Sequence, residues 1–154
     1  MATSTLIQSL DTKDSAGVAV GATPANRRQL ETFFAGAAIA AGDWVSFDTT
    51  KTGATRVVTV IKTAATAGQA NVVGVALRSA ATGDKVDVVV SGYVEGAAVV
   101  SGVLKGESVT TSGVTAGRTL KYASGTHTNA SPCGLCLEDA AVGNTCAVWV
   151  YKQF

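Results

Sequence analysis

Residues 71–90 read NVVGVALRSAATGDKVDVVV, and residues 131–150 read SPCGLCLEDAAVGNTCAVWV. The two stretches align over twenty positions without a gap, and seven of those positions are identical. Each stretch consists of an apolar run of strand length, a polar corner that contains a glycine, and a second apolar run. A sequence that repeats in this way indicates a duplicated pair of strands.

The similarity between the two stretches extends toward their N-terminal sides. Residues 41–45 (AGDWV) and residues 105–109 (KGESV) open the two halves in a similar way. The pseudo-repeats therefore span about residues 41–90 and 105–150. Two such halves can pair to close one barrel, which removes the exposed edges of a sheet.

The chain from Thr32 onward has the pattern of an all-β protein. Short runs rich in valine and threonine recur at roughly ten-residue spacing, separated by glycine turns and without an amphipathic helix between them. We expect one small β-barrel or β-tulip domain over residues 32–154. Its predicted strands are residues 44–48, 56–62, 72–77, 85–90, 93–100, 108–111, 118–122, 133–137 and 145–151.

Residues 1–31 differ from this pattern and are predicted to form an extended N-terminal arm. They show no sustained period of 2 or 3.6 residues. We expect the arm to order against a partner or a neighbouring subunit. Its candidate contact residues are an apolar cluster, Leu6, Ile7 and Leu10, and the adjacent basic pair, Arg27 and Arg28. The alternative interpretation of the basic pair is that it is two solvated charges.

The composition excludes several classes of protein. Alanine, valine, threonine and glycine supply 85 of the 154 residues, charged residues are only 15%, and the net charge is +1. A disordered tail, a coiled coil and a basic nucleic-acid-binding domain are therefore excluded, so no nucleic acid is expected as a partner. The start has no secretory pattern and no apolar run approaches the length of a bilayer span, so we expect no membrane partner and synthesis in a reducing cytosol.

The three cysteines lie in the second copy of the repeat. Cys133, Cys136 and Cys146 align with Val73, Ala76 and Val86, and we therefore predict that all three are small apolar core residues. The C-x-x-C spacing of the first two is that of redox motifs, but those need a helix N-terminus that this stretch does not offer.

One metal alternative stays open. His127 together with the three cysteines has the residue types of a Cys₃His zinc site. The first repeat, however, has no ligands at the matching positions. We expect no metal and no cofactor.

The sequence offers little for catalysis. A nucleophilic site needs a serine or cysteine beside a histidine and a carboxylate, and His127 is placed in a loop by its composition. The glycines form no phosphate-binding motif. We predict no catalytic residues and no enzyme activity. The aromatic residues of the strands are expected to be core or subunit-interface anchors: Trp44, Tyr93, Trp149 and Tyr151.

Three stretches carry a resemblance to a known family. Residues 32–45 (TFFAGAAIAAGDWV), residues 73–84 and residues 92–96 (GYVEG) resemble the head decoration (cement) proteins of tailed bacteriophages. The likeness covers about residues 32–150. It implies a non-enzymatic virion protein that binds the major capsid protein on the outer capsid surface, stabilises the head and forms a homotrimer. The arm residues are then candidate capsid contacts.

Two other functions are kept beside this one. A virion knob or fibre domain would recognise host surface glycans, for which the Thr/Ser-rich stretches 49–55 and 123–131 are candidate loops. An enzyme or zinc protein would be centred on His127 and the cysteines. Copy number in the virion separates the first of these from a decoration protein, and metal analysis tests the second.

Overall fold

The computed structural model describes residues 28–100, 102–124, 131–140 and 144–153. These residues form nine β-strands and a short 3-10 helix, and they contain no α-helix. The all-β prediction is thereby confirmed. None of the described residues belongs to a helix with the length and apolarity that crossing a membrane requires. The elements are β1 (Arg28–Ala35), β2 (Trp44–Phe47), η2 (Gly53–Val57), β3 (Thr59–Lys62), β4 (Val72–Ala76), β5 (Lys85–Ala98), β6 (Ser108–Thr111), β7 (Thr119–Lys121), β8 (Gly134–Cys136) and β9 (Thr145–Val150).

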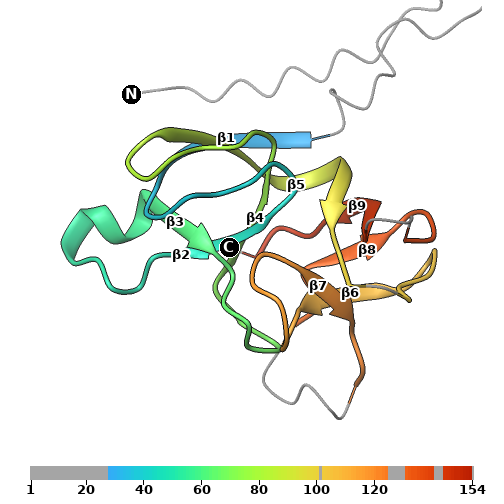
Figure 1. Ribbon diagram of the computed structural model, residues 1–154. Coiled ribbons are helices and arrows are strands. Elements are labelled where there is room, and N and C mark those ends of the chain that lie inside the picture. Colours follow the sequence, from blue (N-terminus) through green and yellow to red (C-terminus); the bar gives the residue numbers. More distant parts are fainter. Residues whose placement is uncertain (1–27, 101, 125–130, 141–143, 154) are drawn as a thin grey trace, which may run out of the picture.

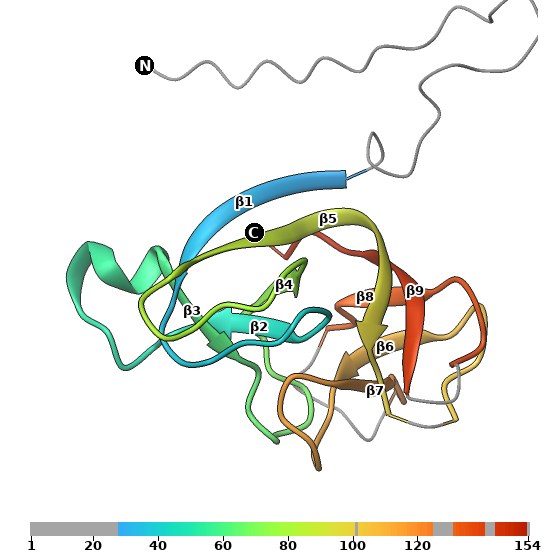
Figure 2. The same ribbon diagram turned by 45° about the horizontal axis from the view of Figure 1, so that its top comes forward.

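The first five strands close a barrel. Their order is β1-β3-β2-β4-β5, and β5 pairs with β1 to complete the ring. The β1–β3 pairing is parallel and the other pairings in the ring are antiparallel. We call this ring the first barrel; it occupies the left of the view in Figure 1 and Figure 2.

The remaining four strands continue the sheet from the C-terminal half of β5, in the order β5-β9-β8-β6-β7. A parallel bridge between Val99 and Thr119 brings the chain just after β5 back beside β7. We call β6 to β9 with the C-terminal half of β5 the second unit. Its connections repeat those of the first barrel.

The strand registers of the two units correspond residue by residue. Val75 lies opposite Val89 in β4 and β5, and sixty residues later Leu135 lies opposite Trp149 in β8 and β9. The corners correspond as well, because Gly42 N donates to Ala76 O and Gly106 N donates to Cys136 O, both at 2.8 Å. The duplication seen in the sequence is therefore also a duplication of hydrogen-bond pattern.

The barrel closes differently from the sequence-based expectation. The two halves were expected to pair into one barrel, whereas the first five strands close a ring without the second half. The physical reason is β1, which pairs with both β3 and β5 and supplies the fifth strand. This strand begins at Arg28, so residues 28–31 belong to the sheet and not to the expected arm. Residues 1–27 lie outside the described residues.

Two further strand boundaries differ from the prediction. Residues 85–90 and 93–100 were expected as separate strands, but Lys85–Ala98 is one strand of 14 residues. The region 56–62 was expected to be strand throughout, but Arg56 and Val57 belong to η2.

Each unit has its own core, and Trp44 joins the two. The core of the first barrel is built from inward-facing side chains such as Phe33, Val45 and Val88. Trp44, fully buried, points to the other side of β2 and packs with the core of the second unit. Its Cη2 atom lies 2.9 Å from where a Cβ on Gly134 would be. Ala97 pairs with Cys146 as Phe33 pairs with the equivalent residue Val86, so Ala97 and Phe33 hold equivalent positions. The core of the second unit, in which Trp44 also packs, therefore has the smaller side chain at this position.

Candidate functional site

Of the predicted contact residues, one falls within the described part of the chain. Leu6, Ile7, Leu10 and Arg27 lie outside the described residues. Arg28 is the first residue of β1, lies opposite Gly92 and is half-buried. Its Nε atom is buried and has no hydrogen-bond partner among the described residues.

Two large apolar side chains on β1 are exposed. The side chains of β1 alternate, so that Phe33 and Ala35 are buried while Leu30 and Phe34 are 48% and 45% exposed. Phe34 N donates to Val58 O at 2.8 Å, which brings the residues after η2 beside the strand. We give the name β1 patch to the exposed apolar residues of β1 and of the segment beside it: Leu30, Phe34, Val57 and Val58.

The sequence analysis missed the β1 patch because it assigned Leu30 to an arm. Exposure alternates along residues 29–35 (QLETFFA), but the residue types do not reveal it, because apolar side chains stand on both faces of the strand: Leu30 and Phe34 are exposed, and Phe33 and Ala35 are buried. The patch also includes Val57 and Val58, which are more than twenty residues away in sequence. Only the parallel pairing of β1 with β3 brings these parts together.

A second surface crosses the outside of the second unit. Leu135, Trp149 and Tyr93 lie opposite one another on β8, β9 and β5 and form a row across the sheet. Trp149 is 38% exposed, and the other two are half-buried. The equivalent residues of the first repeat, Val75 and Val89, are fully buried against the second unit.

The aromatic residues were expected to be core or subunit-interface anchors, and the structure places some of them in the core and others on the outer face. Trp44 is a core residue, with none of its surface exposed. Trp149 and Tyr93 are on the outer face, where an interface is still a prediction.

The acidic residues at the corners hold the chain in place. The Oδ2 atom of Asp43 accepts a hydrogen bond from Ala40 N at 2.8 Å and lies 3.9 Å from the Nζ atom of Lys62. Glu107 does the same in the second unit, with Leu104 N at 3.0 Å and an ion pair to Lys121. The Lys121 ammonium lowers the pKa of the Glu107 carboxyl. These carboxylates are engaged in fixing equivalent corners.

The cysteines are buried, as predicted for apolar core positions. Cys133, Cys136 and Cys146 are each 1% exposed or less. Burial raises the pKa of the Cys133 thiol. Within the described residues no group of three or more histidine, cysteine or acidic side chains is arranged to hold a metal ion. His127, on which the zinc alternative depends, lies outside them, as does most of the candidate glycan loop 123–131.

Comparison with known proteins gives a match at the level of structure. No protein-family model matches the sequence, and no curated protein matches it. The chain is similar to the crystal structure of the head fiber gp8.5 N base of bacteriophage phi29, with a TM-score of 0.54 and 16% sequence identity. The likeness covers 80% of this chain and 94% of that one. It is a likeness of fold. At this level of identity, what the phage protein does is not transferred with it.

Proposed function

We propose that this chain is a structural protein of a bacteriophage head, bound to the outer surface of the capsid through the major capsid protein. The observation that carries the proposal is the fold likeness, which spans nearly the whole of a phage head-fibre base. The resemblance of residues 32–150 to decoration proteins supports it independently, because that resemblance rests on the sequence.

The β1 patch is the proposed point of attachment in the described part of the chain. Its first residue, Leu30, is two residues after Arg28, so the β1 part of the patch continues from the basic pair among the candidate contacts. Exposed leucine and phenylalanine side chains gain free energy when a partner removes them from water. Repeated over many copies on a shell, weak contacts of this size hold subunit junctions together through avidity.

The finer role we propose is decoration: a homotrimer at subunit junctions that stabilises the head. A second candidate, the base of a head fibre, is favoured by the name of the structure that the fold resembles. In that case a few copies would carry a fibre, and glycan recognition on a host surface would belong to the fibre. An enzyme role has no comparable support.

The experiment that distinguishes these roles is a copy-number measurement. Particles from the source are purified, and this protein is quantified against the major capsid protein by mass spectrometry. A ratio approaching one copy per shell subunit is expected for decoration. A small number of copies per particle would favour the fibre base, and absence from the particles would overturn both.

The attachment surface is tested by binding to undecorated capsids in a co-sedimentation assay. We expect the double variant Leu30→Ser and Phe34→Ser to bind about tenfold more weakly or worse, because two apolar side chains no longer leave water. The control is Val114→Ser, which alters a side chain that is 81% exposed and outside the patch. Equal binding by all three proteins would remove the β1 patch from the interface.

The arm is tested separately. Deletion of residues 1–20 is expected to abolish capsid binding and to leave the β-sheet circular dichroism unchanged. Binding that survives this deletion would contradict the role of Leu6, Ile7 and Leu10 as anchors.

A further inference from the structure

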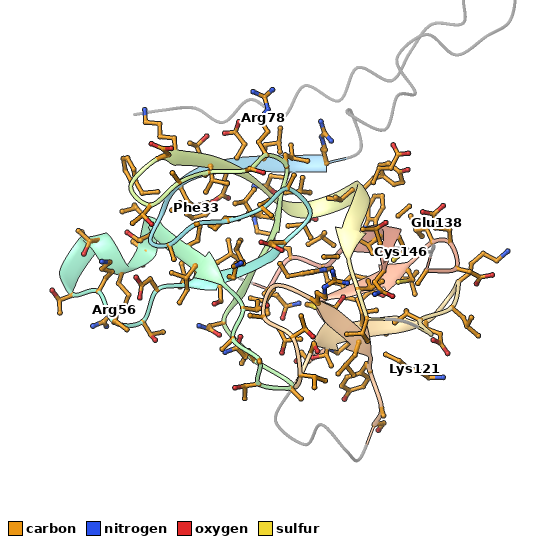
Figure 3. All side chains as sticks on the ribbon, in the orientation of Figure 1. Phe33, Arg56, Arg78, Lys121, Glu138 and Cys146 are labelled. Atoms are coloured by element: carbon orange, nitrogen blue, oxygen red, sulfur yellow. The ribbon has the colours of Figure 1, made fainter. Side chains whose placement is uncertain are left out.

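Two of the three cysteines touch one another inside the second unit. The Sγ atoms of Cys136 and Cys146 are 2.8 Å apart, and both side chains are buried. The residues in equivalent positions of the first barrel are Ala76 and Val86, so the thiol pair has no counterpart there. Figure 3 shows Cys146 in the second unit, on the opposite side of the molecule from Phe33 of the first barrel.

We propose that Cys136 and Cys146 are a site of disulfide formation that cross-links β8 to β9. The oxidant is a low-molecular-weight disulfide such as oxidised glutathione. Each thiol gives up one proton and one electron, and a sulfur–sulfur bond forms between the two side chains. The bond of the small disulfide breaks and takes up both protons and both electrons, which yields two small thiols.

The surrounding backbone holds the two cysteines in place on both sides. Cys136 N donates to Glu107 O at 2.9 Å, and Cys136 lies opposite Val148 in the ladder. Leu137 N donates to Ala147 O at 2.8 Å, which fixes the neighbour of Cys136 against the neighbour of Cys146. The flanking bonds thus hold the two sulfurs 2.8 Å apart, and formation of the cross-link brings them to a bond length of about 2.05 Å.

The third cysteine is directed elsewhere. The Cys133 thiol donates to the carbonyl oxygen of Val109 at 3.4 Å, and its side chain is 1% exposed. We therefore expect it to stay a free thiol, which makes it an internal control. The inference depends only on the geometry of the second unit and stands apart from the proposed role on a capsid.

The test uses the full chain, purified under reducing conditions and then incubated with oxidised glutathione. Thiols are counted in denaturant before and after, and the cross-linked peptides are mapped without reduction. The expected result is a fall from three thiols to one, a mass loss of two hydrogen atoms, and a bond between Cys136 and Cys146. The unfolding temperature should rise by several degrees, because the cross-link restricts the unfolded chain.

The first repeat supplies the matched variants. Cys136→Ala and Cys146→Val introduce the residues that occupy these positions in the first barrel, and each should keep two free thiols and show no rise in unfolding temperature. Cys133→Val should still form the bond and show the rise. Three free thiols in the oxidised wild type, a bond that includes Cys133, or a bond between two chains would each overturn the proposal.

Discussion

Two equivalent glycines show how closely the backbone packs in both units. A Cβ added at Gly74 would lie 2.0 Å from the carbonyl oxygen of Val89, and one added at Gly134 would lie 2.9 Å from that of Trp149. The positions correspond in the repeat, and so do the two carbonyls. Because a side chain of any size would push the neighbouring strand away, glycine is required in both copies.

Gly74→Ala is therefore expected to destabilise the protein severely. The added methyl group meets backbone that is fixed in the sheet, and the loss should be about 3 kcal/mol or more. The measurement is the free energy of unfolding in urea. The control is Gly113→Ala, where the new Cβ would lie 3.2 Å from the Cβ of Ala67 on a loop. A similar loss for both variants would show that glycine content, and not the close approach to Val89, sets the effect.

Asp48 makes the stability of the protein depend on pH. Its Oδ1 atom accepts hydrogen bonds from Thr50 Oγ1 at 2.6 Å and from Thr50 N at 3.1 Å. The hydroxyl of Thr50, followed by its backbone N–H and the Lys51 ammonium, holds the pKa of Asp48 below its ordinary value. A pKa lowered on folding stabilises the protein above the unfolded value of about 3.9, and that contribution is lost as the pH falls through the folded pKa.

Asp48→Asn is expected to reduce this acid sensitivity. The variant should be less stable than wild type at pH 7, because the charged acceptor is gone. The difference should begin to shrink below about pH 4, where Asp48 of the unfolded chain becomes protonated, and should be lost as the pH falls through the lowered pKa of folded Asp48. Urea midpoints measured from pH 7 to pH 2.5 test this. A difference in stability that is constant with pH would exclude Asp48 as the titrating group.

At the scale of elements, the long strand β5 belongs to both units. Its first part pairs with β1 as far as Gly92, and its second part pairs with β9 from Gly92 onward. In the second unit, the second part of β5 takes the position that β1 has in the first barrel. Phe34 of β1 lies opposite Lys85, and Ala98 of β5 lies opposite Thr145, the residue equivalent to Lys85. The first barrel therefore depends on β1, which no other strand replaces.

Truncation at either end of β1 tests this dependence. A chain that begins at Arg28 is expected to fold, because the complete first barrel is retained. A chain that begins at Gly36 lacks β1 and should fail to unfold cooperatively, because β3 and the first part of β5 each lose a partner. The measurement is thermal unfolding followed by circular dichroism. Cooperative unfolding of the shorter chain would contradict the barrel closure described here.

At the scale of the whole molecule, the two units are joined by the outer face of the first barrel. Trp44, Val75 and Val89 turn away from the interior of their own barrel and belong to the core of the second unit. No described residue range forms a third unit on the equivalent face of the second unit, where Trp149 is partly exposed. The duplicated units therefore share one pattern of hydrogen bonds but differ in which outer face is covered.

Trp44→Ala is expected to cost about 3–5 kcal/mol, because it leaves a cavity between two packed units. The matched control is Trp149→Ala, which removes the same side chain from the exposed face and should cost clearly less. Both are measured as free energies of unfolding of the same full chain. Equal losses would mean that Trp44 does not join the two cores.

The sequence by itself determined the fold class, the repeat and the core positions of the cysteines. Short runs rich in valine and threonine predicted the strands near 72–76, 108–111 and 145–150, and the gapless match between residues 71–90 and 131–150 reproduces the observed strand registers. These features depend on neighbours in sequence, where side-chain periodicity and turn chemistry are directly readable.

Only the tertiary structure decided how the strands close and which surfaces remain open. The roles of β1 and of the long β5 depend on pairing between segments about sixty residues apart, which no local pattern specifies. The β1 patch was missed for this reason, and the four predicted contacts in residues 1–27 lie outside the described residues. Val89 and Trp149 hold equivalent positions in the repeat, yet one is buried and the other exposed. Burial is set by what packs on a face, and a residue's sequence neighbours do not carry that information.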